Sequence, residues 1–231
     1  MDLTPPPPRV ASIVGATGNL GQAVAEAFNA GGWTVDPQWL GASRPDVTSP
    51  TAFDGLPSGL RAAVYCAGIN VVAPAAELDL ADWHRTLDIN VTHAFRFARA
   101  AHAKMRGEGG TLVFISSIMA THPYPNRVAY AAAKGALESM TRALATEWGP
   151  DGIRVHAVRL GHLEGLMRTT KANPRLLDAV REKTPLGRLI PPAGVASYIR
   201  WLCEEPAAAV TGSIYEFDPG YVRNRWPLER T

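Results

Sequence analysis

The sequence predicts an α/β protein, a doubly wound parallel sheet in a single domain. Short apolar runs typical of buried strands alternate with longer segments that carry their apolar residues on one helical stripe. The first apolar run leads into a glycine-rich turn that opens a helix. At 231 residues, 46% of them hydrophobic, the chain is long enough to bury one sizeable core. Alternation of this kind is typical of a parallel sheet with helices on both faces.

The apolar runs locate the expected strands, and the longer amphipathic segments locate the helices. The expected strands cover residues 10–14, 33–35, 62–66, 111–115, 153–158 and 213–217. The expected helices cover residues 20–30, 80–105, 129–148 and 194–203, with one short helix within 163–188. Gly31-Gly32 should end the first helix and Gly109-Gly110 the second, because glycine commonly follows the last turn of a helix. Residues 37–60 are rich in Pro, Gly and Ser and carry little regular pattern.

Composition and charge argue against several classes of protein. A formal net charge of +2 is too small to indicate nucleic acid or a membrane surface as a partner. No apolar run reaches the length of a transmembrane helix. The two cysteines, Cys66 and Cys203, lie far apart in apolar segments, so we expect neither a disulfide framework nor a metal site. This cysteine usage fits a reducing cytoplasm.

The turn from Gly15 to Gly21 has the composition of a phosphate-binding loop. It follows the first expected strand and opens the first helix, where glycines let the backbone approach a pyrophosphate and the helix N-terminus supplies amide donors. Right-handed crossovers would bring such a ligand to the carboxyl ends of the strands. The alternative is a tight strand–helix turn that binds nothing. The turn therefore predicts a site for the pyrophosphate of a dinucleotide on a Rossmann-type fold.

The choice between NAD(H) and NADP(H) depends on the residues after the second strand. A carboxylate at that strand end would bind a ribose 2′-hydroxyl, but Asp36 comes early and Trp39 occupies the expected end. Arg44 lies further on and could meet a 2′-phosphate, although an exposed loop arginine is an equally good interpretation. The sequence therefore slightly favours NADP over NAD. Asp46 and Val47 are expected near the adenine, where a carboxylate could accept from the amino group.

Tyr130 and Lys134 carry the clearest sign of chemistry. Four residues apart on an expected helix, their side chains share one face. An ammonium group beside a phenol stabilises the phenolate and lowers its pKa, which makes the tyrosine a general acid or base near neutral pH. Ser116 and Ser117 lie upstream, at the end of an apolar run. Singly, each has an ordinary interpretation, because such residues also occur as surface groups and helix caps.

Taken in order, the motifs resemble the short-chain dehydrogenase/reductase family over almost the whole chain, from Val10 to Tyr221. The matching segments are Gly15–Gly21, Asp46–Thr48, Tyr65–Gly68, Asn90-Val91, Ser117, Tyr130, Lys134, Leu160–Gly165, Thr184–Arg188, Val195-Ala196, Thr211-Gly212 and Asp218–Tyr221. Ser117, and not Ser116, precedes Tyr130 by the thirteen residues usual in the family. The resemblance implies a domain over residues 10–221, with a substrate lid over 163–188 and a tail over 222–231. Four consecutive prolines within residues 1–9 predict a disordered or extended N-terminus.

The resemblance also implies the activity and the roles of the site residues. The activity would be hydride transfer between a nicotinamide cofactor and a small carbonyl or alcohol, with Asn90, Ser117, Tyr130 and Lys134 as the catalytic residues. Tyr130 would be the general acid/base, Ser117 would hold the substrate oxygen, Lys134 would tune Tyr130 and hold the ribose, and Asn90 would fix a water. The implied cofactor-binding residues are Gly15, Thr17, Gly18, Asn19, Leu20, Gly21, Arg44, Asp46, Val47, Cys66, Ala67, Gly68, Asn90, Tyr130, Lys134, Leu160, Gly161 and Leu163.

The chain departs from the family pattern at several cofactor positions. Asn19 replaces the middle glycine of the turn, Leu160 replaces a proline, and Gly165 replaces a threonine that commonly touches the cofactor. Tyr65 and Cys66 replace two asparagines. The segment between the second strand and the Asp46 motif is short, so the helix usually found there should be missing. These changes bear on cofactor affinity more than on the chemistry, because all four catalytic positions are kept.

The substrate is expected between residues 118–128 and 163–188. Ser117 and Tyr130 would contact it, together with His122 and His162, the latter close to the nicotinamide. The cationic residues of the two loops are Arg127, Arg168, Lys171 and Arg175. They suggest a polar or anionic small carbonyl compound, although charges on a solvated lid are the ordinary alternative.

The expected partners are a small-molecule substrate and further copies of the chain. The family resemblance implies a homodimer or homotetramer formed through helices 80–105 and 129–148. Two other functions remain open: a cofactor-binding redox sensor, and a non-redox lyase, dehydratase or epimerase on the same fold.

Overall fold

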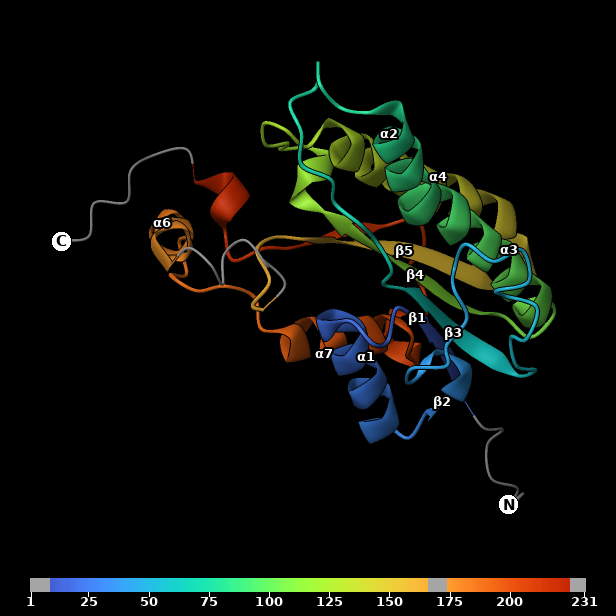
Figure 1. Ribbon diagram of the computed structural model, residues 1–231. Coiled ribbons are helices and arrows are strands. Elements are labelled where there is room, and N and C mark those ends of the chain that lie inside the picture. Colours follow the sequence, from blue (N-terminus) through green and yellow to red (C-terminus); the bar gives the residue numbers. More distant parts are fainter. Residues whose placement is uncertain (1–8, 166–173, 225–231) are drawn as a thin grey trace.

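A parallel six-stranded sheet forms the centre of the computed structural model, which describes residues 9–165 and 174–224 (Figure 1). The strand order is β2-β1-β3-β4-β5-β6, and every neighbouring pair is parallel. The strands are β1 (Val10–Val14), β2 (Thr34–Val35), β3 (Leu60–Tyr65), β4 (Gly110–Ser117), β5 (Ile153–Leu160) and β6 (Ile214–Phe217). This architecture confirms the predicted doubly wound fold.

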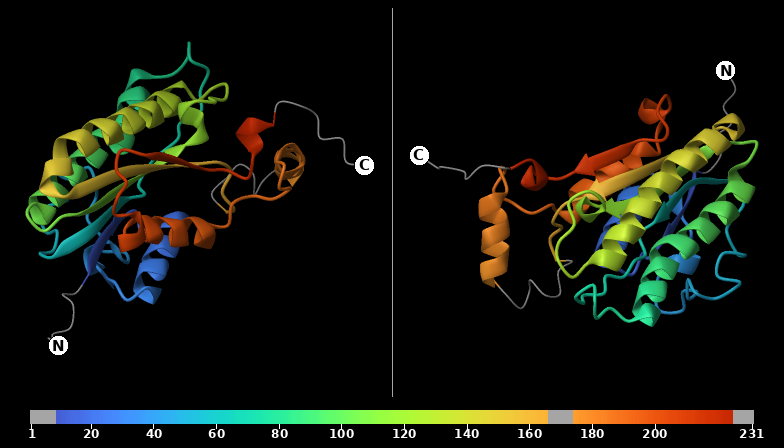
Figure 2. Two further views of the ribbon diagram at one scale, coloured as in Figure 1. Left: turned by 180° about the vertical axis from the view of Figure 1, so that it is seen from behind. Right: turned by 90° about the horizontal axis from the view of Figure 1, so that it is seen from above.

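Helices cover both faces of the sheet, as Figures 1 and 2 show. The helices are α1 (Asn19–Ala30), α2 (Leu80–Leu87), α3 (His93–Met105), α4 (Val128–Trp148), α6 (Pro174–Lys183) and α7 (Pro192–Leu202). Helices α1 and α7 lie on one face, and α2, α3 and α4 lie on the other. Helix α6 stands apart, beyond the ends of β5 and β6. It is the short helix expected within 163–188.

The order of the strands defines where a ligand can bind. The chain passes from β1 outward to β2 and then returns to β3 on the other side of β1. The crossovers therefore diverge between β1 and β3 and leave a crevice at the carboxyl ends of these strands. The Gly15–Gly21 turn follows β1 at this point.

The central strands β1, β3 and β4 are mostly apolar and buried because helices cover both faces of the sheet. In β3, Ala62, Ala63 and Val64 are fully buried, and β4 is buried from Thr111 to Ser117. Helix α1 packs one stripe against the sheet through Leu20, Val24 and Phe28. Burial of such side chains contributes about 1.5–3 kcal/mol each to folding.

The structure corrects the extent of two predicted elements. The predicted helix 80–105 is interrupted between α2 and α3 by a π-helical turn, Asp88–Thr92, with Asn90 at its centre. Turns of this kind occur frequently at functional sites. The predicted strand 33–35 pairs only over Thr34 and Val35. Residues 36–59 contain the 3₁₀ turn Pro37–Trp39 and neither a strand nor an α-helix, which agrees with the missing helix and leaves Asp46 in a loop.

Several sequence predictions concern segments outside the described residues. The proline-rich N-terminus up to residue 8, the tail from 225 onward and residues 166–173 of the expected lid belong to this group. Within residues 9–165 and 174–224, no helix has both the length and the apolar character needed to cross a bilayer.

Candidate active site

The turn after β1 is shaped by two close approaches of its own backbone. Gly15 has φ +85°, a left-handed conformation that strongly favours glycine, and its carbonyl accepts from the Gly18 N–H over 2.9 Å. A Cβ on Gly21 would overlap the Gly15 carbonyl oxygen. Gly18 caps α1 without a side-chain bond, and Thr17, Gly18 and Asn19 are exposed. The N–H groups of this helix terminus are therefore available to an anionic ligand.

The residues after β3 lie against this turn. The Cys66 N–H donates to the Val14 carbonyl over 2.9 Å, and a Cβ on Gly15 would lie 2.9 Å from the Ala67 nitrogen. Gly68 follows, close to the catalytic groups described below. Burial raises the pKa of the Cys66 thiol to about 12, so this side chain stays protonated.

Asp36 stands at the end of β2, but its carboxylate is already bound within the chain. It accepts from Ser12 Oγ at 3.0 Å, from the Gln38 N–H at 3.1 Å and from Gln38 Nε2 at 2.8 Å, and it is buried. The pairing of Ala11 with Val35 sets Asp36 level with Ser12, two residues short of the end of β1. Asp36 is therefore not free to bind a ribose, in agreement with the sequence prediction.

The other residues expected near the adenosine lie in the exposed loop between β2 and β3. Arg44 makes one long contact, 3.4 Å from Nη1 to the Gly41 carbonyl. Asp46 accepts from the Thr48 N–H over 2.9 Å, and this bond lowers the pKa of its carboxyl. Val47 packs half-buried against the core. Arg44 is thus free to turn toward a ligand.

Three predicted catalytic residues meet where β4 ends and α4 begins. Lys134 Nζ donates to the Ile115 carbonyl over 2.7 Å and lies 5.4 Å from the centroid of the Tyr130 ring. The side chains of Ser117 and Tyr130 are hydrogen bonded. Ser117 also accepts from the Met119 N–H over 3.2 Å, which fixes its position at the start of the next turn. One helix and one strand end therefore bring these groups together.

The pKa of Tyr130 differs in direction from the sequence prediction. Burial raises the pKa of Tyr130, and the bond with Ser117 offsets this only in part. The net direction is therefore opposite to the lowering expected from Lys134, whose ammonium group lies 5.4 Å from the ring centroid and donates to Ile115. Burial lowers the pKa of Lys134 itself to about 8.

Asn90 completes the group from the π-helical turn. Its side chain is fully buried, and Nδ2 donates to the carbonyls of Ile69 and Thr86, both at 2.9 Å. Oδ1 is buried and has no hydrogen-bond partner among the described residues. A Cβ on Gly68 would lie 2.6 Å from this oxygen and 3.6 Å from Lys134 Nζ. The unused acceptor therefore lies on the Lys134 side, where a water could bind both groups.

An ion-pair network that the sequence analysis missed holds α4 against the sheet. Glu138 accepts from Ser116 Oγ at 2.8 Å and from Arg159 at 2.8 Å (Nε) and 2.6 Å (Nη2). Arg159 reaches Glu216 of β6 at 3.3 Å. Glu138 lies one helical turn after Lys134, so the Tyr130–Lys134–Glu138 spacing was the available signal. The network fixes the register of the catalytic helix beside Ser117.

The predicted substrate residues His122 and His162 lie in different surroundings. His162 is buried and shares a hydrogen bond with the Tyr124 hydroxyl, 2.9 Å from Nε2. Tyr221 packs edge-on to the imidazole, with ring centroids 4.6 Å apart. Burial lowers the pKa of His162, so the ring is neutral at pH 7. His122 is exposed and contacts Thr121 Oγ1 through Nδ1 at 2.9 Å.

The remaining predicted positions surround the end of β5. Leu160, the last residue of β5, pairs with Ser117 of β4 and with Phe217 of β6, so His162, two residues further on, lies beside the strand end that carries Ser117. Gly161 fits against Asp218, and Leu163 is buried beside Ile190. Arg175 is exposed, whereas Arg168 and Lys171 lie outside the described residues.

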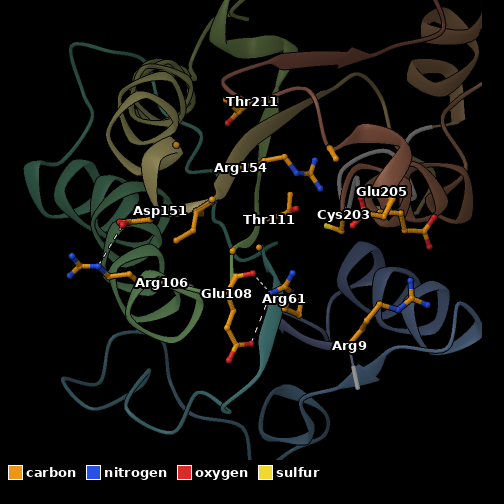
Figure 3. Close-up of a pocket in the computed structure, with 18 of the residues that line it drawn as sticks. Arg9, Arg61, Arg106, Glu108, Thr111, Asp151, Arg154, Cys203, Glu205 and Thr211 are labelled. Carbon is orange, nitrogen blue, oxygen red and sulfur yellow. Dashed lines mark hydrogen bonds and ion pairs between the residues drawn. The ribbon is translucent and has the colours of Figure 1, made fainter. Parts of the chain in front are cut away.

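A separate cavity of 1190 Å³ lies at the opposite edge of the sheet (Figure 3). Its walls come from the amino ends of the strands, including Val10, Arg61, Thr111 and Arg154. Since the catalytic side chains follow the carboxyl ends, this cavity is not part of the candidate site.

Comparison with known proteins decides the family. A short-chain dehydrogenase family model, described as enoyl-(acyl carrier protein) reductase, matches residues 53–222. The chain belongs to the short-chain dehydrogenase/reductase family. The matched region contains all four family catalytic positions, Asn90, Ser117, Tyr130 and Lys134.

Relatives within the family differ in length and name. A tropinone reductase homolog of Arabidopsis thaliana is 33% identical over 68% of this chain, which spans only 60% of that protein. D-threitol dehydrogenase of Mycolicibacterium smegmatis is 30% identical, with 92% of each chain covered. A solved structure from Agrobacterium tumefaciens, described as a putative 2-deoxy-D-gluconate 3-dehydrogenase with bound NADP, has a TM-score of 0.84 and 26% identity, with 93% and 96% of the two chains covered.

Proposed function

We propose that the protein is an NAD(P)-dependent oxidoreductase that transfers a hydride between the nicotinamide and a small carbonyl or alcohol. The observation that carries this proposal is the cluster of Ser117, Tyr130 and Lys134 at the edge of the sheet where the Gly15–Gly21 turn also ends. The cluster provides a proton donor and a hydrogen-bond donor for one substrate oxygen. The turn provides a site for a pyrophosphate.

The residues present fit a nicotinamide dinucleotide. The turn's free N–H groups would hold the pyrophosphate, the backbone at Ala67 and Gly68 would lie beside it, and Lys134 would hold the nicotinamide ribose. When bound, the cofactor supplies or accepts the hydride. NADP is the favoured form, because the Asp36 carboxylate is engaged inside the chain and Arg44 is free. The bound NADP in the structural relative supports the same choice.

The side chains of the cluster would move one proton and hold one oxygen. The raised pKa of Tyr130 keeps its phenol protonated at neutral pH, the form that donates to the oxygen of a carbonyl undergoing reduction. Ser117 would hold the same oxygen. Lys134, with a pKa of about 8, is mostly charged at pH 7 and would stabilise the tyrosinate left behind. Asn90 would hold, through its free Oδ1, the water that returns a proton to Lys134.

The substrate we propose is a small polar carbonyl compound of the polyhydroxylated type. Neutral His162 and the Tyr124 hydroxyl would offer hydrogen bonds rather than a positive charge. One relative is named for such a neutral compound, D-threitol, whereas the structural relative is described by 2-deoxy-D-gluconate, a polyhydroxylated acid. These uncharged groups favour a polar substrate over an anionic one.

The proposal is tested by titrating the purified protein with NADPH and with NADH, followed by nicotinamide fluorescence. The form that binds is then used to screen ketoses and hydroxyketones against simple keto acids. Saturable binding and turnover of hydroxyketones are the expected results. If neither dinucleotide binds at millimolar concentration, the oxidoreductase proposal is overturned and the non-redox functions become the better explanation.

The family's association into homodimers or homotetramers is also proposed for this chain in the cytoplasm. Phe95 of α3 is 40% exposed and Val128 at the start of α4 is 42% exposed, on the face formed by α2, α3 and α4. Light scattering after size-exclusion chromatography tests this, since a monomer at micromolar concentration would contradict it.

A further inference from the structure

A hydrogen bond joins the start of α1 to the chain that leaves β5. Asn19 Nδ2 donates to the backbone carbonyl of Glu164 over 2.8 Å, although 145 residues separate the two. Asn19 is the first residue of α1, directly after the capping Gly18. Both partners are exposed, so the bond crosses the rim of the site and contributes nothing to the core.

Gly165 fits against the same side chain. Its φ of +73° lies in the left-handed region, and a Cβ at this position would be 2.7 Å from Asn19 Nδ2, closer than such atoms approach in proteins. The amide is the end of a short, rotatable side chain, so a residue larger than glycine would push it away from Glu164. A side chain at 165 and the Asn19–Glu164 bond therefore exclude one another.

We propose that Asn19 is a cofactor-positioning residue and that Asn19 and Gly165 form a matched pair. The two positions are departures from the family pattern that look unrelated in the sequence. The family pattern has a glycine at position 19 and a threonine at position 165. In this structure the Asn19 side chain occupies the space next to Gly165 that a side chain at position 165 would need. This assignment rests on the proposed binding of a nicotinamide dinucleotide at the turn.

The position of the Asn19–Glu164 bond indicates how it would affect binding of the dinucleotide. The N–H groups of the first turn of α1 would hold an anion. The Asn19–Glu164 bond lies at the border of that site. The bond limits how far the chain after β5 can move away from the turn. Its loss should therefore speed dissociation of the dinucleotide while leaving Ser117, Tyr130 and Lys134 in place.

The test uses Asn19→Gly, Gly165→Ala and the double variant in the full chain. The dissociation constants and off-rates of NADPH and NADH are measured by nicotinamide fluorescence, and Tm is recorded for each protein. We expect Asn19→Gly to raise the dissociation constant about 3- to 10-fold, the range for one net hydrogen bond, mostly through the off-rate. The kcat at saturating cofactor is measured beside the dissociation constant, so that an effect on cofactor binding is separated from an effect on turnover.

The double variant separates the pair from simple backbone strain. Gly165→Ala should weaken binding in the native background because it displaces the Asn19 amide. In the Asn19→Gly background the same change should alter the dissociation constant less than about twofold, although the strain at φ +73° lowers Tm in both backgrounds. Asn19→Ala is a second variant that favours the helix, and it should match Asn19→Gly in binding.

Gln22→Ala is the matched control, since Gln22 is exposed on the same helix and its amide bonds only to Glu26, at 3.0 Å. Its dissociation constant should equal that of the native protein. If the native protein binds a dinucleotide and both Asn19 variants bind it with the same dissociation constant, the positioning role of Asn19 is overturned. The proposed function is not affected by that result. Additive effects in the double variant overturn the matched pair. A native protein that binds neither dinucleotide overturns the proposed function and the assignment with it.

Discussion

The Tyr124 hydroxyl and the His162 imidazole share a hydrogen bond of 2.9 Å, and their rings are nearly parallel, with an interplanar angle of 9°. Tyr124 belongs to the loop between Ser117 and Tyr130, and His162 follows the end of β5. The bond therefore connects the loop 118–128 to the residue directly before the expected lid, 163–188. Burial lowers the pKa of His162 and favours its neutral form.

Removing the Tyr124 hydroxyl should weaken substrate binding. In Tyr124→Phe, the ring can still stack on His162, but the imidazole loses its partner and its fixed orientation. We expect KM for the carbonyl substrate to rise about 3- to 10-fold with the cofactor dissociation constant unchanged. Steady-state kinetics at saturating cofactor measures this. An unchanged KM would mean that this pair lies outside the substrate site.

Tyr130→Phe should abolish most of the turnover while cofactor binding stays intact. The variant lacks the proton donor, and such groups contribute about 10²- to 10⁴-fold to the rate. The comparison of kcat with the dissociation constant of NADPH, for Tyr130→Phe and for Tyr198→Phe on the distant helix α7, checks this. A Tyr130→Phe protein that turns over at the native rate would support a non-redox function or a different catalytic group.

The rate of carbonyl reduction should fall as pH rises through about 8. Burial sets the pKa of Lys134 near this value, so above it the lysine loses the charge that stabilises the tyrosinate. Tyr130, whose pKa is raised, would lose its proton only at higher pH. A kcat profile from pH 6 to 10 measures the midpoint. A rate that stays level to pH 10 would show that the charge on Lys134 is not needed.

The stability of the fold should decrease between about pH 6.5 and pH 4 because of His156. This residue of β5 is fully buried, and burial together with nearby Arg154 lowers its pKa to about 4. In the unfolded chain the imidazole binds its proton near pH 6.5. Between these values the unfolded state binds more protons, so the free energy of unfolding falls as pH falls, by up to about 3 kcal/mol.

Urea denaturation of the native protein and of His156→Leu at several pH values tests this. The leucine variant fills the same apolar space without a titratable group, so its free energy of unfolding should depend less on pH in this range. His162, whose pKa is also lowered by burial, contributes in the same direction and remains in both proteins. Equal pH dependence of the two proteins would contradict the role of His156.

The sequence by itself determined the features that depend on neighbouring residues. The alternation of apolar runs predicted six strands in a parallel sheet, because the pattern of burial along each strand is local. The Gly15–Gly21 turn was predictable since only glycine tolerates its close backbone approaches. Tyr130 and Lys134 were predictable because four residues along a helix bring two side chains to one face.

Only the tertiary structure decided the features made by residues far apart in the chain. These features are the hydrogen bonds between Ser12 and Asp36, between Arg159 and Glu138, and between Tyr124 and His162. The tertiary structure also showed that Asn19 and Gly165, two unrelated departures in the sequence, meet at one bond. Such contacts depend on how strands and helices pack in three dimensions. The spacing of residues along the chain carries no information about that packing at a separation of 145 residues.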